Sequence, residues 1–149
     1  MTTSLLSEEE LLLRNTVREF SDQVLAPRAA KHDELEEFPH DNFGDIADLG
    51  LLGLMVDEEY GGAGGTTKQV AIVSEEIARG CAATSLIYIV HLTLCTHFIS
   101  HYGNESQKNK YVPDLVSGKK IGAFALTEPG AGSDAAAIQT TAIPANGHL

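Results

Sequence analysis

The first part of the chain has the spacing of apolar residues that is typical of an amphipathic helix. Residues 7–10, Ser-Glu-Glu-Glu, form a capping box that marks the start of this helix. Pro27 is expected to kink or end it, because proline cannot donate a hydrogen bond within a helix. The apolar face is predicted to consist of Leu13, Val17, Phe20 and Val24.

Two further helices are predicted before the middle of the chain. The first lies between Pro39, a typical first-turn residue, and Gly50, a typical C-terminal stop. The second is capped by Thr66 or Thr67 and ends at Gly80. Its buried face is predicted to consist of Val70, Val73 and Ile77.

The most apolar helix is predicted from Leu86 to about His101, with Thr84 or Ser85 at its start. Apolar residues surround most of its circumference, which indicates a helix in the middle of a bundle. Residues 80–104 contain no Lys, Arg, Asp or Glu, but the histidines and hydroxyl groups among them favour a buried helix over a membrane span. A polar helix then follows from about Ser106 to Gly118.

The pattern changes from helical to extended near residue 120. Residues 121–126 form a short apolar run followed by Pro and Gly, and residues 138–143 are rich in β-branched side chains, so both are predicted to be strands. Asn146-Gly147 is a strong hairpin signal, but only two residues follow it. The predicted fold is therefore mainly α, with an N-terminal multi-helix domain (1–119) followed by the first strands of a truncated β domain (120–149).

Composition narrows the function. The 149 residues carry a formal net charge of −11, which disfavours nucleic acid and anionic membranes as partners. The apolar share of 43% is enough for a globular core. The first residues turn acidic at once and resemble neither a signal nor a transit peptide, so a cytoplasmic location is expected. Cys81 and Cys95 are expected to be free thiols.

Several polar groupings are expected to have no catalytic or metal-binding role. His97 and His101 have a spacing that some metal sites use, but no acidic residue accompanies them on the helix, so no metal is predicted. The acidic pairs at 58–59 and 75–76 are expected on solvated faces, because adjacent helical residues point in different directions. The glycine-rich residues 61–65 lack a Walker signature and are predicted to be a flexible turn between helices.

A second glycine-rich loop follows the first predicted strand. Residues 130–135, Gly-Ala-Gly-Ser-Asp-Ala, fit the dinucleotide pattern GxGxxG/A, but no room is left for the long helix that a Rossmann fold requires. Glycines that adopt positive φ and expose backbone N–H groups can form an anion-binding nest. With Thr127 and Ser133 as donors, the loop suits a flat ring joined to a diphosphate, such as FAD. From the residues alone, a tight turn joining two strands explains the loop equally well.

Residues 124–134 read Phe-Ala-Leu-Thr-Glu-Pro-Gly-Ala-Gly-Ser-Asp. This run resembles the signature of the acyl-CoA dehydrogenase family. Residues 49–54, 58–62, 102–104 and 110–113 also fall in the order and spacing that this family shows. The resemblance implies an N-terminal helical domain, a middle β domain and a C-terminal helical bundle, assembled as a homotetramer.

The resemblance also implies a cofactor site. Thr127 would hydrogen-bond the pyrimidine side of the flavin, and Ser133 would lie beside the diphosphate and near the CoA arm of the substrate. The FAD-binding residues carried over by position are Phe124, Ala125, Leu126, Thr127, Glu128, Pro129, Gly130, Ala131, Gly132 and Ser133.

The implied activity is α,β-dehydrogenation of an acyl-CoA thioester, with electrons passed to an electron-transfer flavoprotein. The glutamate base of the family belongs to its C-terminal bundle, so no catalytic residue is assigned within these 149 residues and Glu128 is not offered as a substitute. An isolated fragment is expected to be inactive and to bind FAD weakly. The alternatives are a related acyl-CoA oxidase and a helical interaction module that has lost catalysis.

Overall fold

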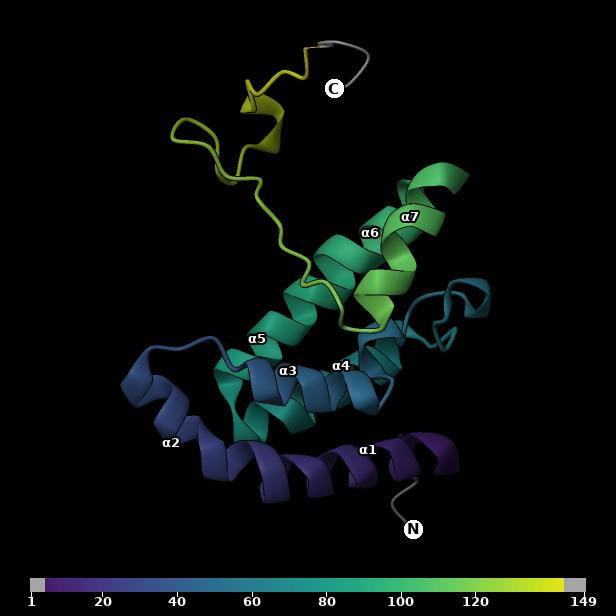
Figure 1. The fold of residues 1–149 in the computed structure, drawn as a ribbon, viewed down its shortest axis with the longest axis vertical. Helices are drawn as coiled ribbons and strands as arrows, with labels where there is room; N and C mark the ends of the chain where they lie inside the picture. Colours follow the sequence, from purple (N-terminus) through teal and green to yellow (C-terminus); the bar gives the residue numbers. More distant parts are fainter. Residues whose placement is uncertain (1–4, 144–149) are drawn as a thin grey trace.

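The computed structural model describes residues 5–143, and within them the fold is mainly α (Figure 1). The α-helices are α1 (Glu8–Phe20), α2 (Ala26–Leu35), α3 (His40–Asp48), α4 (Thr67–Gly80), α5 (Ala82–Ile89), α6 (His97–Tyr102) and α7 (Glu105–Val116). Two π-helical segments, η1 (Ser21–Leu25) and η4 (Val90–Thr96), join α1 to α2 and α5 to α6. The short 3-10 helices are η2 (Leu51–Gly53), η3 (Glu58–Tyr60) and η5 (Ala135–Ala137).

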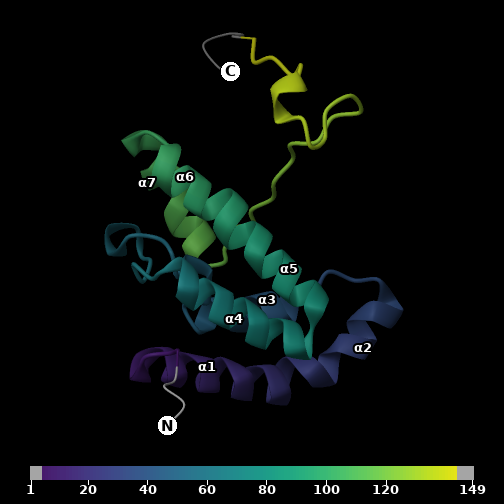
Figure 2. The ribbon, with the colours of Figure 1, turned by 180° about the vertical axis from the view of Figure 1, so that it is seen from behind.

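The helices pack around one main core. Helix α4 contacts both α1 and α5, while α3 covers the start of α5, so the core lies among these four helices (Figures 1 and 2). Its fully buried side chains include Val17, Leu25, Ile46, Leu52, Val73, Ile77, Tyr88 and Leu92. A smaller apolar cluster joins α7 to the loop before α4 through Val56, Tyr60, Val112 and Val116.

The predicted helix boundaries are confirmed where a local capping signal defines them. Ser7 and Glu10 form the expected capping box of α1, with the Glu10 amide 3.1 Å from the Ser7 hydroxyl. Thr66, rather than Thr67, caps α4, and its partner in the capping box is Gln69. Gly50 ends the α3 region with a φ of 71°, a backbone conformation that favours glycine. Each of these signals acts within one helical turn.

Two helix starts differ from the prediction. Pro27 was expected to kink or end the first helix, but it does not end the helical run: α1 passes into the π-helical segment η1, and Pro27 follows in the first turn of α2. Helix α5 begins at Ala82, so Thr84 and Ser85 are not its cap. Both residues are buried inside the helix, where Ser85 donates to the Ser74 carbonyl at 2.8 Å and Thr84 accepts from Asn42.

The uninterrupted helical stretch Ala82–Tyr102 is long and apolar enough to cross a membrane by length and composition alone. A core helix passes the same test, and this one packs on α3, α4 and α7 through side chains that include the fully buried Tyr88 and Leu92. Its opposite face carries exposed apolar residues, with Leu86 64% and Phe98 52% exposed. The prediction of a helix in the middle of a bundle was therefore wrong for the described residues, because one face of this helix is left uncovered.

The glycine-rich residues 61–65 form an ordered turn, so the prediction of a flexible turn was wrong. Every amide from Gly61 to Gly65 donates a backbone hydrogen bond, and those of residues 63–65 bond to carbonyls of Gly53, Val56 and Leu54. The turn is therefore held against the preceding loop by its own backbone.

Glu76 contradicts the prediction of a solvated acidic face. The side chain of Glu76 is only 1% exposed, while its neighbour Glu75 is exposed as expected. Arg18 of α1 donates two hydrogen bonds to the Glu76 carboxylate, at 2.9 and 2.5 Å, and Arg79 donates a third at 3.2 Å. These contacts hold the pKa of Glu76 below its usual value, chiefly through the hydrogen bond from Arg18. An ionised carboxylate thus joins α4 to α1.

Candidate functional site

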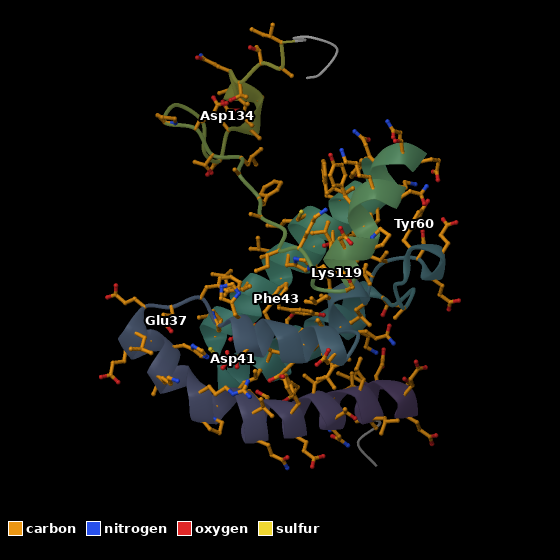
Figure 3. All side chains as sticks on the ribbon, in the orientation of Figure 1. Glu37, Asp41, Phe43, Tyr60, Lys119 and Asp134 are labelled. Atoms are coloured by element: carbon orange, nitrogen blue, oxygen red, sulfur yellow. The ribbon has the colours of Figure 1, made fainter. Side chains whose placement is uncertain are left out.

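The residues predicted to bind the cofactor leave the helical domain as a single extended segment. After Lys119 the chain runs away from α7, and Asp134 lies well outside the helices (Figure 3). Residues 121–126 and 138–143 form no strand within 5–143, because a strand is defined by a partner and neither stretch pairs with another. Phe124 and Leu126 are 43% and 46% exposed, so they leave an apolar surface uncovered.

A tight turn shapes the centre of this segment. Glu128 and Ala131 exchange two backbone hydrogen bonds, at 3.0 and 3.1 Å, with Pro129 and Gly130 between them. Ala131 is consequently only 3% exposed, while most of the ten candidate residues stay exposed. The turn is the local structure that the Pro-Gly pair favours.

Glu128 closes the loop that follows this turn. Its carboxylate accepts hydrogen bonds from the amides of Gln139 and Thr140, both at 2.9 Å, and from the Thr140 hydroxyl. The hydrogen bond from the Thr140 side chain is the main reason why the pKa of Glu128 is lowered. An ionised carboxylate engaged by three donors is poorly suited to remove a proton from a substrate, consistent with assigning it no base role.

The loop between residues 127 and 133 offers uncovered hydrogen-bond donors. Within residues 5–143, neither the hydroxyls of Thr127 and Ser133 nor the amides of Gly130, Gly132 and Ser133 donate a hydrogen bond. A Cβ placed on Gly130 or Gly132 would meet no atom within 4 Å, so open space lies above both backbones. Uncovered amides and hydroxyls are the donors that phosphate oxygens and the polar edge of a flavin require, so this set fits FAD.

The backbone of the loop bears on the anion-binding nest and on the Rossmann interpretation. Neither Gly130 nor Gly132 has a positive φ, so the nest with positive-φ glycines is not formed in this structure. The exclusion of a Rossmann helix is confirmed for the described residues: only η5 follows the loop, and Asp134 caps it by accepting from the Ala136 amide.

One residue that the sequence left without a role connects this segment to the helices. His91 is fully buried and accepts a hydrogen bond from the Gly122 amide at 2.9 Å. A histidine within an uncharged, apolar helix was the available signal, because a buried imidazole needs hydrogen-bond partners.

The two histidines of α6 lie against each other. The rings of His97 and His101 stack with centroids 5.9 Å apart, and the described residues hold no group of three or more His, Cys, Asp or Glu side chains that could bind a metal.

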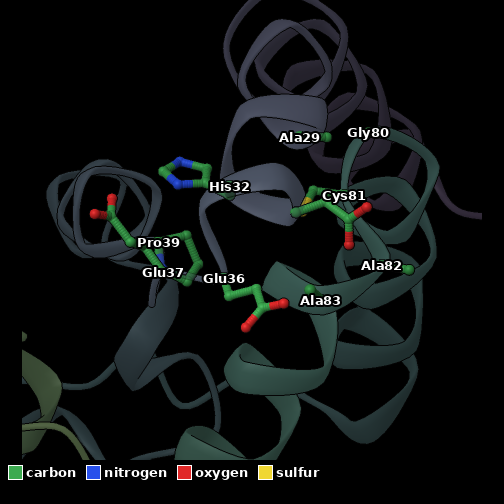
Figure 4. A pocket seen from close by; sticks show the side chains of 10 residues that line it. Ala29, His32, Glu36, Glu37, Pro39, Gly80, Cys81, Ala82 and Ala83 are labelled. Atoms are coloured by element: carbon green, nitrogen blue, oxygen red, sulfur yellow. The ribbon is translucent and has the colours of Figure 1, made fainter.

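A separate cavity of about 420 Å³ lies between the end of α2 and the junction of α4 with α5 (Figure 4). Asp33, Glu36 and Glu37 line it together with His32 and Cys81. Such an acidic lining repels phosphate groups, so the cavity is unsuited to a dinucleotide or to CoA. The open donors at residues 127–133 remain the candidate site.

Together, the packed helices and the trailing glycine loop define a helical domain that leads into an exposed segment with uncovered hydrogen-bond donors. The model of the family described as "Acyl-CoA dehydrogenase, N-terminal domain" matches residues 7–119. The chain belongs to this family.

Curated relatives match the chain along most of its length. It is 42% identical over 143 residues to the short-chain specific acyl-CoA dehydrogenase of Clostridium acetobutylicum, covering 96% of this chain and 38% of that protein. It is 41% identical over 138 residues to an acryloyl-CoA reductase (NADH) of Anaerotignum propionicum, covering 93% and 35%. The chain thus spans little more than a third of the length of these relatives.

Solved structures match the fold. A glutaryl-CoA dehydrogenase of Mycobacterium smegmatis superimposes with a TM-score of 0.88 at 32% identity, covering 97% of this chain and 38% of that one. A structure described as the electron transferring flavoprotein of Acidaminococcus fermentans gives 0.88 at 32% identity, covering 98% and 38%. The FAD complex of PigA gives 0.88 at 28% identity, covering 96% and 38%.

Proposed function

We propose that the protein containing these 149 residues is an FAD-dependent acyl-CoA dehydrogenase, and that this chain supplies its N-terminal helical domain and the first part of its flavin site. The observation that carries the proposal is the set of uncovered donors at residues 127–133 in a chain of this family. Bound FAD would supply the acceptor for the hydride that leaves the substrate.

Within the site, residues 124–133 would bind the cofactor. The exposed Phe124 and Leu126 would lie against the flavin ring, and the Thr127 hydroxyl would donate to its polar edge. The amides of Gly130 and Gly132 and the Ser133 hydroxyl would hold the diphosphate, with Ser133 also near the CoA arm of the substrate. Glu128 would contribute by keeping the loop closed through its bonds to residues 139–140.

Other assignments rest on the same family membership. We propose a domain boundary between residues 119 and 120, and the family match, which ends at residue 119, supports it. The substrate would be an acyl-CoA thioester, the electron acceptor an electron-transfer flavoprotein and the assembly a homo-oligomer. The proposed cytoplasmic location comes from the sequence rather than from the family. The glutamate base would lie outside these 149 residues.

Two other functions make different predictions for the purified protein. An acyl-CoA oxidase would pass electrons from its reduced flavin rapidly to oxygen, whereas a dehydrogenase would react slowly with oxygen. A helical interaction module would be purified colourless and would stay colourless with added FAD, a result that would exclude the flavin proposal.

Removing the two side-chain donors tests the site. In the protein containing this chain, Thr127→Val and Ser133→Ala are each expected to raise the dissociation constant of FAD about tenfold, because each removes one hydrogen bond to a polar or charged ligand group. Fluorescence titration of the apoprotein with FAD measures this change.

Thr141→Val is the matched control, since Thr141 is exposed on the same segment and lies beyond the proposed site. It is expected to leave the FAD affinity unchanged. If Ser133→Ala alters neither FAD affinity nor acyl-CoA affinity, the assignment of Ser133 is wrong.

A further inference from the structure

His91 sits where the helical core meets the extended segment. It belongs to η4, is fully buried, and contacts the edge of the Phe43 ring at a centroid distance of 5.0 Å. Its two ring nitrogens face different partners: Nδ1 lies 2.9 Å from the amide nitrogen of Gly122, and Nε2 lies 3.1 Å from the carbonyl oxygen of Leu115. One imidazole therefore bridges the end of α7 and the beginning of the extended segment.

The partners determine the protonation state of the ring. A carbonyl oxygen only accepts, so Nε2 carries the hydrogen, and the Gly122 amide only donates, so Nδ1 is bare. The Thr96 hydroxyl lies near Nε2 but gives its hydrogen to the His91 carbonyl at 2.8 Å. Burial lowers the pKa of His91, which further favours the neutral ring, although the bond to Leu115 opposes this shift.

Gly122 is held from its other side as well. A Cβ at this position would lie 2.6 Å from the Cys95 sulfur and 3.3 Å from His91 Nδ1, so only glycine lets the backbone approach the ring. The next residue, Ala123, hydrogen-bonds the Cys95 sulfur through its backbone. Within the part of the chain that the structure describes, no hydrogen bond connects residues 124–143 to the helices.

We propose that His91, as the neutral Nε2–H tautomer, is a positioning residue that fixes where the FAD-binding segment leaves the helical domain. Gly122 is two residues before Phe124. Its hydrogen bond to His91 therefore sets the position of the apolar side chains of Phe124 and Leu126 and of the donors at residues 127–133. This role rests on the proposed FAD site, although the hydrogen-bonded anchor itself does not depend on the cofactor. His91 acts through the backbone of Gly122 rather than by touching the ligand.

The first experiment tests the anchor without FAD. In the 149-residue chain, nitrogen-15 NMR of His91 is expected to show a bare Nδ1 and a protonated Nε2, and the Gly122 amide is expected to exchange slowly with solvent. Rapid exchange of that amide, or the opposite tautomer, would overturn the proposal.

Two substitutions then separate positioning from stability. In His91→Asn the amide oxygen can replace Nδ1 and accept from Gly122, whereas in His91→Gln the longer side chain can replace Nε2 and donate to Leu115. Both lose one of the two bonds. Positioning predicts that His91→Gln raises the FAD dissociation constant of the full-length protein about tenfold, while His91→Asn changes it by less than about threefold.

The outcomes are distinguishable. If both variants weaken FAD binding equally and in proportion to their loss of thermal stability, His91 is only a structural residue and the proposal is wrong. If no protein, including the unsubstituted one, binds FAD while the Gly122 amide stays protected, the proposed function fails and the positioning role fails with it, although the anchor remains.

Discussion

Gly62→Ala is expected to lower the free energy of unfolding by about 3 kcal/mol, since overpacking of a rigid site falls at the upper end of its usual range. A Cβ at Gly62 would lie 2.0 Å from the Val56 carbonyl oxygen and 2.5 Å from the Val56 Cβ. Val56 cannot retreat, because it is fully buried and its carbonyl accepts the Gly64 amide at 2.8 Å. Chemical denaturation followed by circular dichroism measures the loss.

Gly44→Ala is the control, because it is expected to raise the free energy of unfolding rather than lower it. Gly44 lies in α3, is exposed, and a Cβ there would meet no atom within 4 Å. Alanine is expected to stabilise the helix by about 0.5–1 kcal/mol through its better helix propensity. If Gly62→Ala were no more harmful than Gly44→Ala, the close packing of residues 53–65 would not exist in solution.

Arg18→Met is expected to lower the free energy of unfolding by about 2 kcal/mol, because it leaves the buried Glu76 carboxylate with Arg79 as its remaining charged partner. The expected loss is below the usual range for a broken buried pair, since Arg18 is itself 43% exposed and Arg79 stays. Glu76→Gln is expected to be milder, at about 1 kcal/mol, because the arginines it releases can reach water. Thermal and urea unfolding show whether Arg18→Met loses more stability than Glu76→Gln.

The double variant Arg18→Met with Glu76→Leu is the discriminating control. Replacing both charged partners with apolar side chains removes the buried charge, so much of the lost stability should return. A double variant that is less stable than Arg18→Met alone would contradict the argument that an unpaired buried carboxylate causes the loss.

The same ion pair predicts a pH dependence. The pKa of Glu76 in the folded chain is below its ordinary value of 4.5, so its contribution to stability is complete above pH 4.5. Below that value the unfolded chain takes up the proton first, and the contribution shrinks until the pH falls below the folded pKa. The stability difference between the unsubstituted chain and Glu76→Gln should therefore narrow as the pH falls below 4.5, as measured by urea unfolding across that range.

Residues 124–133 show how far a sequence motif can be interpreted. The run at residues 124–133 indicated a flavin loop by resemblance, and the structure adds that its hydroxyls and three of its amides are uncovered within the described residues. Neither Gly130 nor Gly132 uses the positive φ that glycine permits. Glycine permits such backbone angles but does not impose them, so composition could not decide the conformation.

The sequence by itself determined the features that depend on neighbours within about one helical turn. The capping boxes of α1 and α4 and the stop at Gly50 all arise from side chains that reach only three or four residues along the chain. Apolar spacing likewise identified Val17, Val73 and Ile77 as core residues.

Only the tertiary structure decided which polar groups are buried and what they hold. Arg18 and Glu76 are 58 positions apart, and His91 and Gly122 are 31 apart, so no local pattern links either pair. Burial removes water from these groups and leaves each dependent on a partner that only the folded chain brings near. For that reason the sequence placed Glu76 in solvent and left His91 without a role. In the folded chain, Glu76 joins α4 to α1, and His91 anchors Gly122 at the start of the extended segment.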